Sequence, residues 1–405
     1  MPLFGRHKAR LCAATSVVSL ARYDLLGRVL VIPLEGIRVL DFSTLLPGPL
    51  ATLILAEAGA QVIKIERPER GDEMRSYTPE FGVDSVNFAL LNRGKESVEF
   101  DLKSSEAGEV LRPLIERTDV LVEQFRPGVM KRLGLGYDEL HEVNPRLIYC
   151  SITGYGKEGP RAGVAAHDLN YVAETGLLGL TTGADGAPAI PQALLADIGG
   201  GAYPAVMNIL LGLLQRERTG EGAHLDVSMS DNIFTFLYWA LGNGMVAGDW
   251  PEPGAELVTG GSPRYNIYRT ADGRYVAAAP LEERFWQTFC NLLELEDDLR
   301  VDSKDPEATI AAVAERIALH PASYWQERFE GHDVCCSVVR SVREAMDDEH
   351  FNSRGLFEWV VENGTDDRAI PALPVPVMQE FRRPERRLGY PRLGEANERL
   401  EKEMR

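Results

Sequence analysis

The sequence has few cysteines and histidines, and none of them is spaced as a metal site or a redox pair. The five cysteines are Cys12, Cys150, Cys290, Cys335 and Cys336, which form no C-x-x-C pair. The seven histidines show no H-x-x-x-H spacing. Because zinc sites and redox dithiols need such spacings, we expect reduced thiols and no bound metal.

Positive charge and long hydrophobic runs are also scarce. The chain has 43 basic and 61 acidic residues, a formal net charge of −18, which argues against non-specific attraction to nucleic acid or to an anionic membrane. The most apolar long stretch, AVMNILLGLL at 205–214, is too short to span a bilayer. We therefore expect a soluble, cytoplasmic protein without nucleic-acid or membrane partners.

Residues 1–34 differ from the rest of the chain because they carry almost no acid. Their charged residues are Arg6, Lys8, Arg10, Arg22, Arg28 and a single acid, Asp24. This composition is typical of an organelle-targeting segment, which would make the protein mitochondrial, and equally of a start assigned too far upstream. We expect this extension to be poorly ordered.

Strand-like and helix-like segments alternate through residues 36–156. GIRVLDFST at 36–44 is typical of a buried strand, LPGPLATLILAEAGA at 46–60 of a helix, and QVIKIE at 61–66 of a second strand. The repeated alternation predicts an α/β fold with a Rossmann-like, mostly parallel sheet covered on both faces. LLPGP follows the first strand in place of G-x-G-x-x-G, so we expect no nicotinamide cofactor.

The composition of the sequence changes after residue 230, which predicts a second domain. GDWPEPGAELVTGGSP is rich in Pro and Gly, as linkers are, and YNIYRTADGRYVAAAP predicts two strands around a tight turn. We expect a large α/β domain at 35–230 that residues 365–405 complete, a linker at 231–260, a small α+β domain at 261–335 and a return linker at 336–364.

His167 and Asp168 stand where a loop enters an apolar helix, in GVAAHDLNYVAETGLLGL. Asp168 suits the N-cap or first turn of that helix, where a carboxylate accepts hydrogen bonds from free backbone N–H groups. The same pair suits a proton-transfer site, because imidazole and carboxylate groups serve as general acids and bases. The residues alone leave both interpretations open.

Eight collinear stretches cover about residues 33–290: PLEGIRVLDFSTLLPGPLAT, GAQVIKIERPERGD, NRGKESVEFDLKS, VLVEQFRPGVMKRLGLGYDEL, NPRLIYCSITGYGKEGP, AHDLNY, LLADIGGGAYPAV and YRTADGRYVAAAPLEERFW. Together they resemble the CaiB/BaiF family, also called class III CoA-transferases, and within it the α-methylacyl-CoA racemases. The resemblance implies an acyl-CoA substrate, no cofactor beyond its CoA moiety, and two-domain chains that form interlocked homodimers.

The resemblance also implies the chemistry. Racemising a 2-methylacyl thioester needs two acid/base groups on opposite sides of one carbon, and the family pattern assigns these roles to His167 and Asp197. Glu282 is implied to bind the histidine, and the backbone amide of Asp168 to hold the enolate oxygen. Taken singly, Asp197 also suits a helix cap and Glu282 a solvated first-turn glutamate. The positions implied to contact CoA are Leu45, Arg67, Leu102, Lys103, Phe125, Arg126 and Arg132.

Two other functions stay open, a CoA-transferase and a binding protein without catalytic activity. In the CoA-transferase branch of the family, an aspartate at the position of Asp168 attacks as a nucleophile, and CoA moves between carboxylic acids. His167 together with Glu282 favours the racemase, because the transferases as a rule lack a histidine before the aspartate. A binding protein without turnover is the third alternative, and the retained acid/base residues argue against it.

Overall fold

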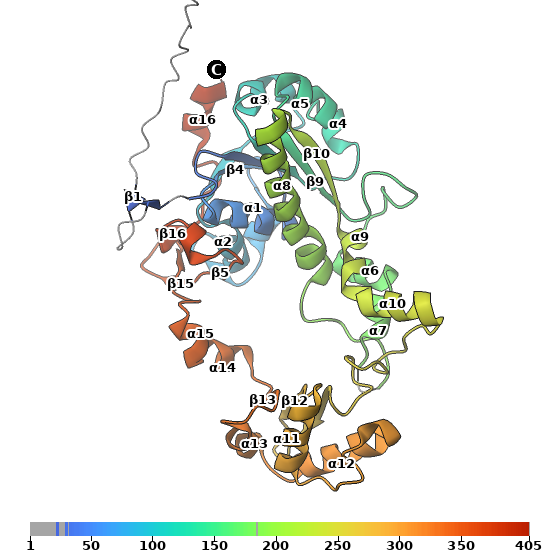
Figure 1. Cartoon of the computed structure of the whole chain (residues 1–405). Coiled ribbons are helices and arrows are strands. Elements are labelled where there is room, and N and C mark those ends of the chain that lie inside the picture. Colours follow the sequence, from blue (N-terminus) through green and yellow to red (C-terminus); the bar gives the residue numbers. More distant parts are fainter. Residues whose placement is uncertain (1–21, 24–28, 31, 184, 405) are drawn as a thin grey trace, which may run out of the picture.

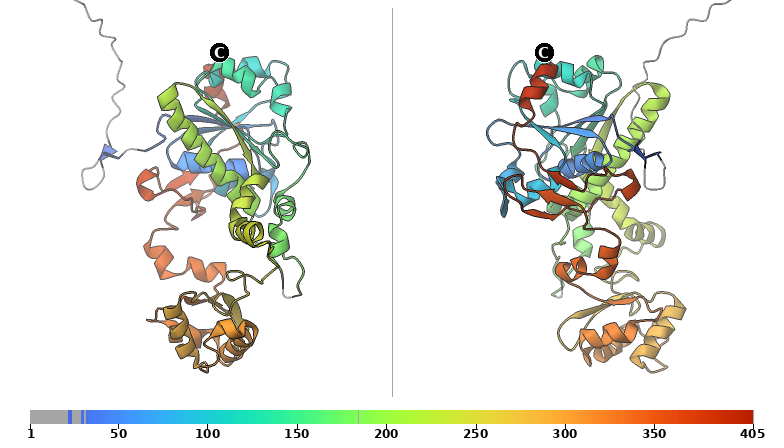
Figure 2. Two further views of the ribbon diagram at one scale, coloured as in Figure 1. Left: turned by 45° about the vertical axis from the view of Figure 1, so that its right-hand side comes forward. Right: turned by 90° about the vertical axis from the view of Figure 1, so that its left-hand side faces the viewer.

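A computed structural model describes residues 22–23, 29–30, 32–183 and 185–404. It has a large α/β body and a small domain, joined by two connections (Figures 1 and 2). Most of the N-terminal extension, including its predicted disorder and targeting role, lies outside the described residues. Within it, the two-residue strands β1 (Arg22–Tyr23) and β2 (Val29–Leu30) form an antiparallel pair.

The large body is built on a six-stranded sheet in the order β10-β9-β8-β3-β4-β7. Its strands are β3 (Arg38–Asp41), β4 (Gln61–Glu66), β7 (Glu96–Glu99), β8 (Val120–Glu123), β9 (Ile148–Thr153) and β10 (Ala223–Ser228). Each neighbouring pair is parallel, which confirms the predicted sheet. The sequence did not predict β10, because His224 and Asp226 interrupt the apolar pattern of this edge strand.

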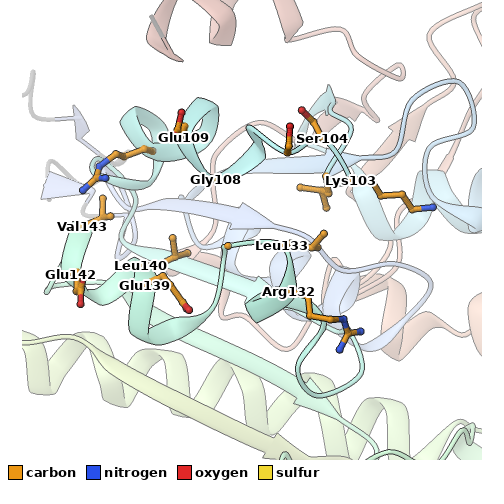
Figure 3. Close-up of a pocket in the computed structure, with 14 residues that line it drawn as sticks. Lys103, Ser104, Gly108, Glu109, Arg132, Leu133, Glu139, Leu140, Glu142 and Val143 are labelled. Carbon is orange, nitrogen blue, oxygen red and sulfur yellow. The ribbon is translucent and has the colours of Figure 1, made fainter.

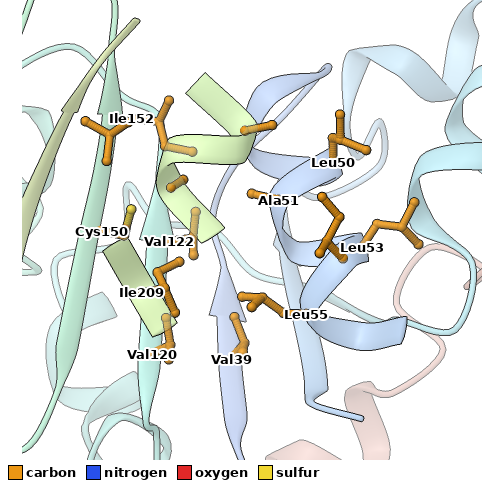
Figure 4. Packing of buried hydrophobic residues seen from close by; sticks show 14 of the residues in the cluster. Val39, Leu50, Ala51, Leu53, Leu55, Val120, Val122, Cys150, Ile152 and Ile209 are labelled. Atoms are coloured by element: carbon orange, nitrogen blue, oxygen red, sulfur yellow. The ribbon is translucent and has the colours of Figure 1, made fainter. Parts of the chain in front are cut away.

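Helices cover both faces of the sheet, as the alternating pattern predicts. Helices α1 (Pro47–Glu57) and α8 (Tyr203–Thr219) cover one face, and α3 (Ala107–Ile115), α5 (Tyr137–Val143) and α16 (Asn397–Met404) cover the other. Successive strand residues point to opposite faces, so Val39 packs with Leu53 and Ile209 in the first core (Figure 4) while Leu40 packs in the second.

The apolar segment after Asp197 is longer than the sequence predicts. The π-helix η2 (Ala196–Ala202) runs directly into α8, and together they form a helical segment of 24 residues. Among the described residues this is the one segment long and apolar enough to cross a membrane by length and composition, and 44% of its apolar window is buried in the protein. Its buried face includes Ala205, Ile209 and Leu213, which pack against the sheet.

The strand order reverses beside β3. The chain passes from β3 to β4 and β7 on one side, and then to β8, β9 and β10 on the other. The loops that follow β3 and β8 therefore leave the sheet in opposite directions from neighbouring strands. Ligands bind in the crevice that such a reversal opens at the carboxyl ends of parallel strands.

The small domain is α+β, as predicted. Its sheet has the order β11-β12-β13, from β11 (Asn266–Arg269), β12 (Tyr275–Ala278) and β13 (Cys336–Val338), and is antiparallel. Helices α11 (Glu283–Leu293), α12 (Pro306–Ala318) and α13 (Ala322–Phe329) pack on it around Trp286 and Phe289. This core is separate from those of the large body.

The two segments expected as linkers are partly regular. Within 231–260, helical structure extends to residue 247 through α9 (Met229–Ile233), η3 (Phe234–Leu237) and α10 (Tyr238–Ala247). Residues 336–364 begin with β13, include α14 (Val342–Met346) and α15 (Glu349–Ser353), and end just after β14 (Val360–Glu362). The remaining elements are η1 (Glu73–Ser76), β5 (Glu80–Phe81), β6 (Asp84–Ser85), α2 (Val86–Asn92), α4 (Val129–Arg132), α6 (Asp168–Glu174), α7 (Leu177–Leu180), η4 (Asp302–Lys304), β15 (Ala369–Pro371), η5 (Gln379–Phe381) and β16 (Arg387–Gly389).

The C-terminal segment returns to the large body and is held there by a buried charge cluster. The carboxylate of Glu57, at the end of α1, lies 2.7 Å from Nε of Arg93 and 2.6 Å from an Nη atom of Arg382. All three side chains are buried. Since Arg382 is far from the other two in sequence, this cluster ties the end of the chain to its first helix.

We expect Glu57→Gln to destabilise the protein strongly, because it leaves two buried guanidinium groups without their counter-charge. Breaking one side of a buried ion pair costs about 3–5 kcal/mol. Glu358→Gln is the matched control, since Glu358 pairs with Arg386 at the surface, where such pairs contribute at most about 1 kcal/mol. Urea unfolding measures both, and equal losses would contradict the assignment.

Candidate functional site

A cavity of about 380 Å³ lies at the reversal of the strand order. It is bordered by the loops that follow β3, β8 and β9 and by the starts of α6 and η2. Its lining includes Leu45, Pro47, Gln124, Phe125, Arg126, Thr153, Tyr155, His167, Asn170, Tyr171, Asp197 and Met229. The cavity therefore occupies the position where the sheet topology favours ligand binding.

The cavity brings His167 and Asp197 together, although they are far apart in sequence. His167 is the N-cap residue of α6, and its backbone N–H donates to Oδ1 of Asn170 at 3.0 Å. Asp197 lies in the first turn of η2. Two side chains that can each take or give a proton thus line one hollow.

Asp168 has a different place in the site. Its side chain is only 7% exposed and is not among the described residues that line the cavity. Its Oδ1 accepts hydrogen bonds from the backbone N–H groups of Ala196 at 2.7 Å and Asp197 at 3.0 Å. The carboxylate therefore caps η2, a helix other than the one in which Asp168 stands, and joins the two segments that carry His167 and Asp197.

Asp197 has the strongest electrostatic signature in the cavity. Burial, and after it the negative charge of Asp168, raises the pKa of Asp197 to about 7. An ordinary aspartate has a pKa near 3.8 and is fully ionised at neutral pH. Asp197 is therefore poised to hold or release a proton near neutral pH, as an efficient general acid or base must be.

Close packing holds η2 against the rest of the site. A side-chain Cβ at Gly200 would lie 2.4 Å from the backbone oxygen of Met229, so only glycine lets these two segments meet. Met229 also lines the cavity. The glycines after Asp197 therefore let η2 pack directly against the backbone at Met229, and this packing positions the Asp197 carboxyl group.

Glu282 does not reach the cavity within one chain. It is the exposed N-cap residue of α11 in the small domain. Among the described residues, none of the small domain lines the cavity, and no hydrogen bond joins Glu282 to His167. The contact that the family resemblance implies is therefore absent from the single chain.

The candidate CoA contacts fall into three groups. Leu45, Phe125 and Arg126 line the cavity with His167. Leu102, Lys103 and Arg132 line a second pocket of about 490 Å³, and Figure 3 shows Lys103 and Arg132 at the same end of it.

Arg67 is the third group: among the described residues it lines neither pocket. Its Nε donates to the backbone oxygen of Gly71 at 2.8 Å, and an Nη atom lies 3.5 Å from the Glu73 carboxylate. The basic candidates Lys103, Arg126 and Arg132 are exposed and available to phosphate groups.

Several cavity residues were not predicted from the sequence. Gln124 directly follows β8, Thr153 ends β9, and Tyr155 lies two residues further on. Each stands at the carboxyl end of a parallel strand, which is the sequence signal that could have identified them. No cluster of three or more potential metal ligands occurs in the described part of the chain.

Comparisons with known proteins agree with this architecture. A family model described as CoA-transferase family III matches residues 34–397. A solved structure of a CaiB/BaiF family protein from Brucella suis superposes with a TM-score of 0.79 at 26% identity, covering 92% of this chain and 99% of that one. The chain belongs to the CoA-transferase family III.

The curated relatives divide between two activities. The chain is 34% identical to the α-methylacyl-CoA racemase of Homo sapiens, over 86% of this chain and 89% of that protein. It is also 34% identical to the acetyl-CoA:oxalate CoA-transferase of Acetobacter aceti, over 92% of this chain and 96% of that protein. Sequence identity alone therefore leaves both activities open within the family.

Proposed function

We propose that the protein racemises 2-methylacyl-CoA thioesters by moving a proton at C2. One observation carries this proposal: His167 and Asp197 line the same cavity, while the Asp168 carboxylate is buried beside it and holds two backbone N–H groups. Two acid/base groups in one cavity suit proton removal and return. A carboxylate held in this way is less suited to attack a thioester.

In the proposed reaction the imidazole of His167 takes the proton from C2 of one enantiomer. The electron pair of the broken C–H bond moves toward the thioester carbonyl, whose oxygen becomes an enolate oxygen. The backbone N–H of Asp168, in the first turn of α6, donates to that oxygen, where a helix N-terminus favours negative charge. The carboxyl group of Asp197 then gives its proton to the opposite face of C2, and the reverse reaction exchanges the two roles.

Each turnover requires that His167 and Asp197 hold one proton between them. The rate should therefore fall at a pH low enough to add a second proton to the pair, and at a pH high enough to remove the one proton that the pair holds. Because the equilibrium constant between the two C2 epimers does not depend on pH, kcat/KM has the same two limbs in both directions. The raised pKa of Asp197 places its titration close to neutral pH.

CoA transfer is the alternative function, and the equal identity to a CoA-transferase supports it. In that reaction the Asp168 carboxylate would attack the thioester carbonyl, release CoA thiolate and form a mixed anhydride. The thiolate would then attack the aspartyl carbonyl, giving an aspartyl-CoA thioester and releasing the first acid as a carboxylate. A second carboxylate would attack this thioester and displace the CoA thiolate to form a new mixed anhydride. The thiolate would then attack the acyl carbonyl of that anhydride, giving the new acyl-CoA and the free Asp168 carboxylate.

We expect 2-methylacyl-CoA incubated with the protein in heavy water to take up deuterium at C2 and lose optical purity without any added acid. The reason is that the proton returned to C2 comes from groups that exchange with solvent. Mass spectrometry and chiral chromatography of the product measure both changes. Transfer of CoA that depends on an added carboxylic acid, with no label at C2, would establish the transferase instead.

Substitutions at adjacent positions separate the two mechanisms. We expect His167→Ala to lower racemisation by about 10²–10⁴-fold, the usual contribution of a positioned acid or base. Asp168→Asn retains an oxygen that can accept from Ala196 and Asp197, so racemisation should survive. Because it removes a negative charge beside Asp197, it lowers the pKa of Asp197 and moves the acid limb of kcat/KM to lower pH.

The opposite pattern would contradict the racemase. Loss of all activity in Asp168→Asn, near-normal activity in His167→Ala and an acyl-enzyme trapped by hydroxylamine would together assign the transferase chemistry.

We propose that the active form is a homodimer in which Glu282 of a second copy completes the site. Helix α8 exposes an apolar stripe of Tyr203, Met207, Leu210, Leu211 and Leu214 at helical spacing, and exposed apolar residues continue through η3 and α10. A contiguous exposed apolar face of this kind supports an interface. Glu282 is exposed on the small domain and has no place in its own chain's cavity.

We expect co-expression of His167→Ala with Glu282→Gln to restore activity that neither variant has alone. In the mixed dimer one site would combine the intact His167 of one chain with the intact Glu282 of the other. Racemisation by the purified mixed dimer, with sedimentation to establish its mass, measures this. A stable monomer, or no restored activity, would contradict the shared site.

A further inference from the structure

The proposed mechanism makes no use of four charged side chains that lie fully buried beside the cavity. They are Asp41 at the end of β3, Lys64 in β4, Asp72 before η1 and Lys95 before β7. Burying charges is costly unless each is paired and hydrogen-bonded. Burial alone would raise the pKa of Asp41, but the charges of Lys64 and Lys95, with hydrogen bonds from Ser43 and Thr52, hold it at about 2, so Asp41 is ionised at neutral pH.

These charges hold the loop after β3. The Lys64 ammonium group lies 2.9 Å from Oδ2 of Asp72 and donates to the backbone oxygen of Ser43 at 2.6 Å. The Lys95 ammonium group lies 3.2 Å from Oδ2 of Asp41. Asp41 in turn accepts from the backbone N–H of Ser43 at 2.9 Å. Both ion pairs therefore reach the same short loop.

The loop contains a backbone conformation that needs such support. Leu45 has φ 62°, in the left-handed region that side chains with a Cβ disfavour. Its backbone N–H donates to the Asp72 carboxylate, at 3.1 Å from Oδ1 and 3.3 Å from Oδ2. A hydrogen bond to a buried carboxylate is stronger than one to a neutral group, and Lys64 supplies the balancing charge.

Leu45 lines the cavity, so its conformation shapes the site. The loop has little freedom to shift elsewhere. A Cβ at Gly48 would lie 2.1 Å from Cβ of Ser43, and the N–H of Gly48 donates to Oε1 of Gln124 at 3.0 Å. Gln124 also lines the cavity, so this contact joins the two loops at the reversal of the strand order.

We propose that Asp72, with Lys64 as its counter-ion, is a positioning residue that sets the affinity for acyl-CoA by holding Leu45 in the left-handed conformation at the cavity wall. The proposal rests on the proposed function only in taking a CoA thioester as the ligand. Asp72 does not itself line the cavity, as the described residues show. It acts through the backbone of Leu45.

Asp72→Asn tests the proposal, because asparagine keeps an oxygen acceptor and loses the charge. Titration calorimetry with CoA as the probe should show Kd rising about tenfold, which corresponds to about 1.4 kcal/mol. KM for 2-methylacyl-CoA should rise by a similar factor, with kcat within about twofold, because a wall contact serves bound substrate and transition state equally. An unchanged Kd would overturn the proposal.

A purely structural role is separated by a matched control. Asp72 also accepts from the N–H of Met74 at 3.0 Å, so its loss destabilises η1 as well. Glu57→Gln removes a buried counter-charge away from the cavity, and it should lower stability while CoA affinity stays unchanged. An equal rise in Kd for both variants would show that Asp72 acts through stability alone.

Substitutions at Leu45 keep the proposal testable if Asp72→Asn does not fold. Leu45→Pro cannot adopt positive φ and has no N–H for Asp72, whereas Leu45→Asn loses the same side chain but tolerates the left-handed region. We expect Leu45→Pro to bind CoA about tenfold more weakly than Leu45→Asn, and equal affinities would contradict the inference. If CoA binding depends on Asp72 while no racemisation is detected, the proposed function fails and this inference stands.

Discussion

The arrangement of the site depends on one carboxylate that caps a helix from outside it. Asp168 begins α6, yet its Oδ1 accepts from the first two N–H groups of η2. That contact joins the segment carrying His167 to the segment carrying Asp197, and its charge contributes to the raised pKa of Asp197. The position of Asp197 and its raised pKa therefore both depend on Asp168. In the reaction we propose, this buried aspartate would support proton transfer without touching substrate.

Buried charge is used in the same way elsewhere in the large body. Lys64 with Asp72 supports the loop after β3, and Glu57 with Arg382 holds the returning C-terminal segment. The chain carries a net charge of −18. An acid buried without a partner would destabilise the fold or take up a proton, because unpaired buried charge is costly. Each of these buried acids is instead paired with a lysine or an arginine, and the pair holds together segments that are distant in sequence.

The sequence predicted the elements whose apolar pattern is unambiguous, such as β3, α1 and β4, and it missed β10, where His224 and Asp226 break that pattern. His167 and Asp197 were identified through family resemblance, and the structure places them in one cavity. The direction of the Asp168 carboxylate could not be predicted, because it depends on where η2 begins in space. The left-handed backbone conformation of Leu45 could not be predicted either, because a leucine in the sequence gives no indication of positive φ.

We expect Asp197 to exchange a proton near neutral pH while the Asp168 carboxylate holds the N–H groups of Ala196 and Asp197. Infrared titration of the full chain, taken as the difference between the wild type and Asp197→Asn, follows the carboxyl band of Asp197 directly. We expect a midpoint at about 7, moving to lower pH when Asp168→Asn is introduced. A midpoint at the ordinary aspartate value, unaffected by Asp168, would contradict it.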